Sequence, residues 1–465
     1  MRATTVLAAI IGALVGAFAA TLAASDPDLF WHLASGTWML DHGRILDRDV
    51  FSFTMMGTPY SAGQWLGEVI YAALYRASGW LAIDLLRGVL IGIAVFFIAR
   101  VVLRFQPHPG WAILPIVAAI LVSKLAWGDR PQLFSVALFP AYLDILLADR
   151  VGGSRRASLL VPLTLLWANL HGASVAGLGL MVVFAVEAWL TRAPQRSRLT
   201  LVLLLSIAAS QLTPSGPSAF SFAASYAGSA SLVVEERPAD VTTAAGLVFA
   251  VLLIGALGLV LRADRTELLA RTRSPLLWIG LVSPFTVLGL AHQRLLPYAT
   301  MVLAPLVAAL LPALLRRPVA IAPAVPRSLG ALAIGAVALA GCAVALVAAP
   351  RSPDLASYPA SALPALLDRP GNLLNAYDWG GFLIFAAPEH PTFIDGRGAA
   401  LYPVRLIKEF DTAVGLKPGY RDVLTAHDIS LVLIRPERAL AVALREDGWS
   451  IVAEESGSWV LLQRK

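Results

Sequence analysis

Eleven apolar runs limit what this chain can fold into more strictly than any other feature of its sequence. A helix needs about 20 residues to cross the hydrocarbon core of a bilayer, and most of these runs reach or approach that length. Charged residues make up only 14% of the 465 residues, whereas a soluble domain carries about 25%. The pattern predicts an α-helical polytopic membrane protein of about 11 transmembrane helices. The runs lie at 4–24, 80–103, 110–127, 131–148, 158–170, 173–190, 199–212, 242–261, 275–291, 295–315 and 328–349.

The arginines between the runs predict the orientation. One set of alternate loops is rich in them, as in the loop with Arg150, Arg155 and Arg156, whereas most loops of the other set carry one, such as Arg130. Because cytoplasmic loops are enriched in Lys and Arg, we expect the first set in the cytoplasm. The N-terminus is then cytoplasmic, in a multi-pass protein of the cytoplasmic (inner) membrane. The net charge of +6 follows from these topology signals, so no nucleic-acid partner is expected.

The composition becomes mixed polar after Pro350, which predicts a second domain. We expect a transmembrane domain over 1–349, with 25–68 as its first outer loop carrying amphipathic helices, and a small extracytoplasmic α/β domain over 350–465. Within the latter, the patterns predict helices at 401–414, 420–427 and 437–446, and strands at 391–394, 429–434, 449–454 and 457–463.

Three carboxylates mark the first outer loop. Asp26 and Asp28 follow the first apolar run, and Glu68 begins the next helix. Such groups could accept a proton from an acceptor hydroxyl. Asp28 and Glu68 could also ligate a divalent metal such as Mg²⁺ or Mn²⁺. Helix capping by Asp26 and Asp28 is the alternative, and the residues alone do not decide between these roles.

Basic groups lie in other outer loops. The guanidinium groups of Arg130 and Arg294 suit bidentate phosphate binding, with His171 and His292 as further candidates. Contact of Arg130 with a lipid headgroup and an end-of-helix role for His171 are the alternatives.

Four residues of the C-terminal domain, Asp378, Trp379, Asp395 and Arg397, could line a recognition surface. Turn chemistry and an internal pair between Asp395 and Arg397 form the alternative, which the local sequence favours.

Several motifs occur in a familiar order: Asp26 to Leu33, Arg130-Pro131-Gln132-Leu133, Trp167 to Gly172, Tyr377 to Gly381 and Phe393 to Arg397. With them the chain resembles a large bacterial family of polytopic proteins grouped with the GT-C glycosyltransferases. That superfamily includes protein mannosyltransferases, oligosaccharyltransferases, lipid A aminoarabinose transferases and RgtA-like enzymes.

The resemblance implies a GT-C-like fold and a sugar donor carried on a polyprenyl phosphate, with membrane lipid around it. The acceptor would be a glycan, a lipid or a protein. An acidic residue of the first outer loop, here Asp26 or Asp28, would act as base or metal ligand, and Arg130 and Arg294 would stabilise the leaving phosphate. Relatives often carry an acidic residue where this chain has Gln64, which puts the metal requirement and the activity in doubt.

The leading hypothesis is therefore a glycosyltransferase acting at the outer face of the membrane. A lipid-linked-glycan transporter or flippase is a second hypothesis, although Lys124, Asp144 and Glu187 lie close to the ends of their runs. A non-catalytic assembly or sensor protein is the third.

Overall fold

The computed structural model describes residues 2–216, 237–312 and 324–465. They form two compact units, Met1–Leu22 with Leu81–Arg351, and Ala23–Trp80 with Ser352–Lys465. The expected domain boundary after residue 349 lies two residues from this division. The loop 25–68, however, belongs to the same unit as the C-terminal segment. We describe each unit by itself.

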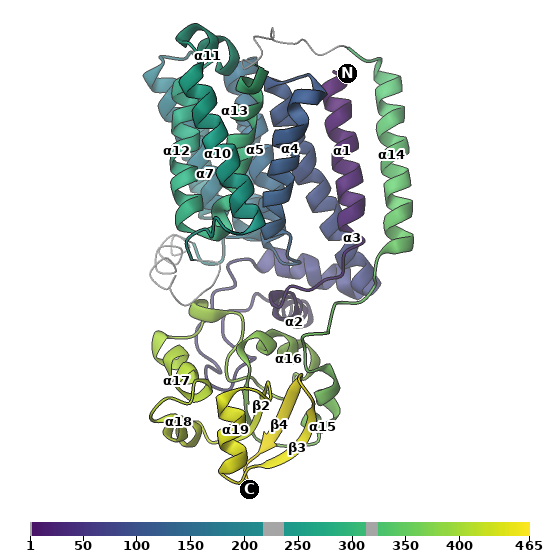
Figure 1. The fold of residues 1–465 in the computed structure, drawn as a ribbon, viewed down its shortest axis with the longest axis vertical. Helices are drawn as coiled ribbons and strands as arrows, with labels where there is room; N and C mark the ends of the chain where they lie inside the picture. The colour runs from purple at the N-terminus through teal and green to yellow at the C-terminus, as the bar shows by residue number, and fades with distance from the viewer. Residues whose placement is uncertain (1, 217–236, 313–323) are drawn as a thin grey trace. The chain divides into compact units, whose positions relative to one another are not determined.

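Helices make up the first unit (Figure 1). All eleven apolar runs contain a helix. Some of the helices that follow one another closely are joined by a short 3-10 turn or a bend. The helices are α1 (Ala3–Ala19), the second half of α3 (Trp65–Phe105), α4 (Pro109–Ser123), α5 (Gln132–Gly152), α6 (Leu160–Leu170), α7 (Ser174–Leu190), α8 (Arg196–Ser210), α10 (Ala244–Arg262), α11 (Arg265–Thr272), α12 (Pro275–Ala291), α13 (Leu296–Leu310) and α14 (Arg327–Ala348), with 3-10 turns η1 (Lys124–Ala126), η2 (Arg156–Leu159) and η5 (Gln293–Leu295).

The count of about 11 spans is not supported. Among the described residues, six helices are long and apolar enough to cross a membrane, or seven if the bent pair α11 and α12 counts as one span. The helices over 3–19, 156–170 and 174–190 are apolar but shorter. Helix α6 has 11 residues and rises only about 16 Å, roughly half of the hydrocarbon thickness. The described helices therefore support six or seven of the predicted crossings by length and composition.

Glycines let three helices of the first unit approach closely. Gly12 and Gly16 of α1 face Gly92 and Gly88 of α3, and a Cβ on Gly16 would lie 2.5 Å from the carbonyl oxygen of Gly88. Two Gly-x-x-x-Gly pairs thus pack backbone against backbone, as small residues do between membrane helices. Helix α14 runs along α1 (Figure 1), where a Cβ on Gly341 would lie 3.2 Å from that of Ala17.

We predict that Gly16→Ala destabilises the protein by about 1–3 kcal/mol, because the new methyl group overpacks the contact with α3. Gly255→Ala on α10 is the matched control, since no atom lies within 4 Å of its Cβ position. There the alanine should be neutral or stabilise the helix by up to about 1 kcal/mol. Thermal unfolding in detergent measures the stability of both variants. Equal effects of the two substitutions would contradict the packing argument.

The second unit is built on a four-stranded sheet of order β1-β2-β4-β3. Strands β1 and β2 are parallel, and the other two pairs are antiparallel. The strands are β1 (Asn372–Asn375), β2 (Ile429–Ile434), β3 (Ser450–Glu455) and β4 (Trp459–Gln463), and the helices are α2 (Asp28–His42), the first half of α3, α15 (Leu363–Leu367), α16 (Gly380–Ala386), α17 (Val404–Val414), α18 (Tyr420–Ala426) and α19 (Ala439–Glu446).

The predicted elements after residue 400 are confirmed, but the strand at 391–394 is wrong. Thr392 forms only isolated bridges, to Ser52 and Leu373. This segment instead joins the first loop to the sheet: Thr392 N donates to Phe51 O, and Phe53 N donates to Thr392 O, each at 3.1 Å.

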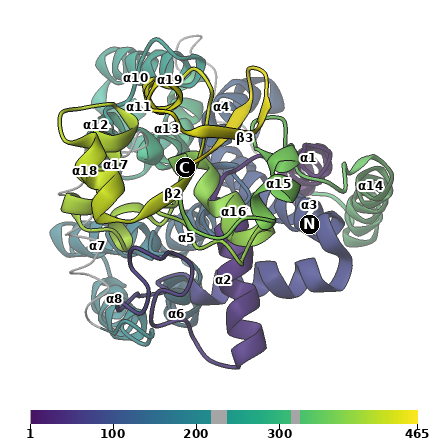
Figure 2. The same ribbon diagram turned by 90° about the horizontal axis from the view of Figure 1, so that it is seen from below.

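Residues 23–80 contribute to both cores of this unit. Tyr60 packs in the core of Phe393 and Leu374, while Phe30 of α2 packs edge-on against Phe382 of α16, with ring centroids 5.4 Å apart. Helices α2 and α16 lie side by side (Figure 2). The first outer loop is therefore an integral part of the C-terminal domain, because its apolar side chains are buried there.

Helix α3 is broken where the two units meet in the sequence. Ser78 and Gly79 are non-helical, and Gly79 has φ 60° and ψ −145°. Only glycine adopts this combination readily, so Gly79 accounts for the break.

Candidate functional site

The predicted site residues fall into two groups, one in each unit. The basic group lies in the first unit, where a small pocket is lined by Leu125, Arg130, Gln132, Gln293 and Arg294. Arg130 precedes α5, and Arg294 lies in the 3-10 turn η5 before α13. The fold thus brings together two guanidinium groups that are 164 residues apart in the sequence (294 − 130). Two cations with flanking amides favour an anion.

Asp129, the residue before Arg130, does not simply cap a helix. Both of its carboxylate oxygens accept from Nη1 of the buried Arg87, at 2.7 and 2.6 Å. Arg87 also donates to Asp84 Oδ1 at 2.8 Å and to the carbonyl oxygens of Ala19 and Leu22. This network holds the turn before α5 to α3 and to the end of the first helix. It therefore fixes the backbone from which Arg130 projects.

His171 lies close to both arginines and is held in one tautomer. Trp167 Nε1 donates to Ser135 Oγ at 2.7 Å, so the Ser135 hydroxyl is free to donate to His171 Nδ1 at 2.9 Å. The backbone N–H of Ala173 donates to the same nitrogen at 3.2 Å. Nδ1 is thus an acceptor, and the proton of a neutral ring resides on Nε2.

The charge state of His171 follows from its surroundings. Burial first, and then the positive charges of Arg130 and Arg294, lower the pKa of His171 to about 3. The ring is therefore neutral near pH 7 and offers Nε2–H as an uncharged donor beside two cations. The sequence predicted a place for His171 in this group but not the roles of Ser135 and Trp167.

The fourth basic candidate, His292, ends helix α12. Its backbone N–H donates to Leu288 O at 2.9 Å, and neither its side chain nor that of His171 is among those that line the pocket.

The acidic group belongs to the second unit, at the start of α2. Asp26 Oδ1 accepts from the backbone N–H of Asp28 at 2.9 Å, and Asp28 Oδ1 accepts from Trp31 Nε1 at 3.0 Å. Asp26 therefore stabilises the helix start, and Asp28 stands in the first turn, where the helix dipole favours a negative charge. Asp28 is half-buried, which leaves its carboxylate reachable.

Glu68 is fully buried, with Oε1 3.0 Å from His32 Nδ1. Its second oxygen has no hydrogen-bond partner, and the ring of Trp31 stacks over His32 with centroids 3.6 Å apart. Glu68 thus belongs to a pair that supports α2 from within. Sequence reasoning missed His32, whose only signal was its place on the apolar stripe of α2.

The expected Mg²⁺ or Mn²⁺ does not fit these carboxylates. Within the described part of the chain, no group of three or more His, Cys, Asp and Glu side chains could hold a metal ion. Such ions need open carboxylate oxygens, whereas Glu68 is buried against His32 and Asp28 shares one oxygen with Trp31.

The four tail residues separate into one exposed and three buried side chains. Asp378 is exposed and pairs with Arg435 at 2.8 Å, while Trp379, Asp395 and Arg397 are buried. Of the four, only Asp378 faces solvent as a recognition residue would.

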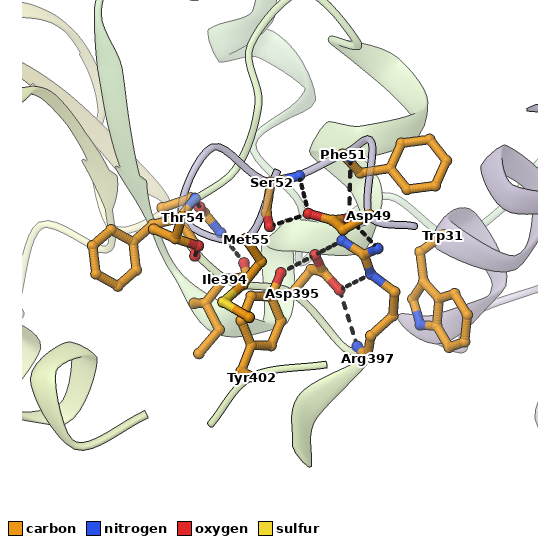
Figure 3. Close-up of polar contacts among 12 residues, drawn as sticks. Trp31, Asp49, Phe51, Ser52, Thr54, Met55, Ile394, Asp395, Arg397 and Tyr402 are labelled. Carbon is orange, nitrogen blue, oxygen red and sulfur yellow. Dashed lines mark hydrogen bonds and ion pairs between the residues drawn. The ribbon is translucent and has the colours of Figure 1, made fainter. Parts of the chain in front are cut away.

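Arg397 forms the buried centre of the second unit (Figure 3). Its guanidinium donates to both oxygens of Asp395, at 2.8 and 2.7 Å, and to Asp49 Oδ1 at 2.5 Å. The rings of Phe51 and Tyr60 lie 5.2 and 5.5 Å from its Cζ. Asp49 in turn accepts from the backbone and hydroxyl of Ser52, and Asp395 accepts from the Tyr402 hydroxyl. We call Asp49, Asp395 and Arg397 the ionic lock.

Substituting Arg397 by Met should destabilise the second unit by about 3–5 kcal/mol, because two buried carboxylates lose their counter-charge. Arg435→Met is the control, since Asp378 is exposed and the pair, together with the contact of Arg435 with the Trp379 ring, contributes only about 1–2 kcal/mol. Tryptophan fluorescence during thermal unfolding measures the loss of stability in both variants. A loss of stability in Arg397→Met that is no larger than the loss in Arg435→Met would contradict the importance of the lock.

For His171 we expect no titration between pH 5 and 8 and a proton on Nε2, measured by ¹⁵N NMR of histidine-labelled protein and assigned with His171→Gln. The unfolded chain binds a proton at this residue below about pH 6.5, and the folded protein does not until about pH 3. Lowering the pH through that window therefore destabilises the wild type, and less so the Gln variant. A ring that titrates near pH 6.5 would contradict the arrangement.

Comparison with known proteins identifies the fold. No family profile matches the chain, and no curated protein matches its sequence. Three solved structures of the Archaeoglobus fulgidus oligosaccharyltransferase are similar at 12% identity, and each comparison covers 93% of this chain and 69% of the other. The TM-scores are 0.55 for the apo form, 0.53 for the complex of that enzyme, AglB, with an inhibitory peptide and a dolichol-phosphate, and 0.52 for the form tethered to an acceptor peptide. The chain is thus a membrane protein whose fold is similar to that of the archaeal oligosaccharyltransferase.

Proposed function

We propose that this protein is a GT-C-type glycosyltransferase that takes a sugar from a polyprenyl-phosphate-linked donor. The reaction would occur at the outer face of the cytoplasmic membrane, with the N-terminus in the cytoplasm and the C-terminal domain outside. One observation carries the proposal: Arg130 and Arg294 line one pocket close to the neutral donor His171. The archaeal enzyme of similar fold, seen with a dolichol-phosphate, supports the choice of donor.

The chemistry assigns one role to each group. The acceptor oxygen attacks the anomeric carbon, the bond from that carbon to the phosphate oxygen breaks, and the phosphate leaves with the electron pair. Arg130 and Arg294 stabilise the growing charge on the phosphate, and Nε2–H of His171 donates to it without adding to the positive charge. Asp28 takes the proton of the acceptor hydroxyl, and Asp378 belongs to the surface that binds the acceptor.

The transporter hypothesis gains no support from the charges of the helices. Asp144 pairs with Arg100 and Arg104, at 2.9 and 2.5 Å, and Glu187 pairs with Arg150 at 2.7 Å. These carboxylates are therefore paired with arginines.

The test is transfer by the purified full-length chain in nanodiscs, supplied with a panel of radiolabelled polyprenyl-phosphate and polyprenyl-diphosphate sugars and a membrane glycan extract. Arg130→Ala and Arg294→Ala should each lower kcat about 10²–10³-fold, the usual loss when one donor to a developing anion is removed. Asp28→Asn should remove transfer while the protein still folds.

Arg405→Ala is the control, because Arg405 is exposed and its ion pair is with Glu409, one helical turn away. Binding of unlabelled polyprenyl phosphate, followed by native mass spectrometry, should weaken in the Arg130 variant and not in the Asp28 variant. Full transfer by both the Arg130→Ala and the Asp28→Asn variant would disprove the assigned mechanism.

A further inference from the structure

Two glycines of the C-terminal segment lie against the start of α2. A Cβ on Gly396 would overlap Oδ1 of Asp28 and lie 3.0 Å from Trp31 Nε1. A Cβ on Gly381 would lie 2.8 Å from Pro27 O and 3.2 Å from Trp31 Cδ1. Neither glycine has a positive φ, so the requirement for glycine here is close approach and not backbone conformation.

The Gly396 backbone therefore packs against the hydrogen bond from Trp31 Nε1 to Asp28 Oδ1, which measures 3.0 Å. The indole N–H holds that oxygen by a hydrogen bond, and the missing side chain of Gly396 leaves the space that the oxygen occupies. The peptide turn of Asp395, Gly396 and Arg397 is thus in direct contact with the acidic residue of the first loop.

The ionic lock holds this turn. The backbone N–H of Arg397 donates to Asp395 Oδ1 at 3.0 Å, and the guanidinium joins that carboxylate to Asp49, 348 residues away. Backbone pairing of Thr392 with Phe51 and Phe53, and the bond from Thr54 Oγ1 to Phe393 O at 2.7 Å, attach the same stretch to the loop. Figure 3 shows the lock beside Trp31. All these groups belong to the second unit.

We infer that the Asp395-Gly396-Arg397 turn is a positioning element for Asp28, and that the C-terminal domain acts on the reaction by setting the place of this carboxylate. The inference rests on the proposed function, in which Asp28 accepts the proton of the acceptor hydroxyl. A base must be held within a few tenths of an ångström of its working position, and a displacement of about 1 Å costs on the order of 100-fold in rate. Gly396 and Arg397 touch no substrate in this scheme.

The decisive variant is Gly396→Ala, because its methyl group must displace the Asp28 carboxylate. We expect kcat for sugar transfer to fall about 10- to 100-fold, with KM for the lipid-linked donor and binding of polyprenyl phosphate unchanged. Gly63→Ala is the matched control in the same unit, since no atom lies within 4 Å of its Cβ position. Tyr402→Phe, which removes one hydrogen bond to Asp395 and keeps the ring, should give a smaller fall in kcat alone.

Hydrogen–deuterium exchange of the backbone amides of residues 28–33 gives a second readout that does not need activity. Exchange in this stretch should rise in Gly396→Ala and stay at the wild-type level in Gly63→Ala. Wild-type kcat in Gly396→Ala, or unchanged exchange at 28–33, would overturn the inference. If the wild type transfers no sugar from any donor but the exchange rises as expected, the proposed function fails while the placement of Asp28 by the turn stands.

Discussion

The second unit depends on the burial of one guanidinium between two carboxylates. Arg397 is 2% exposed and Asp49 and Asp395 are fully buried, so none of the three charges is solvated by water. A buried cluster of charges is tolerated only when each charge is paired with an opposite charge. Asp49 and Arg397 are 348 residues apart in the sequence, and the three residues meet only when loop and C-terminal segment fold together. This requirement makes the two segments one domain.

The lock has a consequence for chemistry because the turn that carries Arg397 also touches Asp28. Asp28 stands in the first turn of a helix whose apolar face is buried under that same domain. A domain that sequence alone presents as a separate appendage thereby becomes the support of the first loop. Burial of its apolar side chains within this unit holds helix α2.

In the first unit, too, an arginine is buried between carboxylates, with a different set of contacts. Arg87 is buried with Asp84 and Asp129, and this network fixes the turn before α5. Glycine pairs bring α1 and α3 close together, so that Arg87 can reach the carbonyl oxygens at the end of the first helix. The pocket of Arg130 and Arg294 is built on this rigid base. His171 adds a donor whose neutral state is set by the neighbouring arginines and by burial.

The membrane class, the helices and most elements of the small domain after residue 350 could be predicted from the sequence alone. These properties follow from apolar length and periodicity, which are local. The sequence also singled out Arg130, His171 and Arg294, because the arginine pattern predicted one outer face for their loops, where guanidinium groups suit a phosphate. The folded structure is needed to see that Trp379 is internal, that the favoured pair of Asp395 and Arg397 also includes Asp49, and that Glu68 is paired with His32. It also decided that the first loop belongs to the C-terminal domain. Each of these depends on which distant groups share a buried space, and no local pattern carries that information.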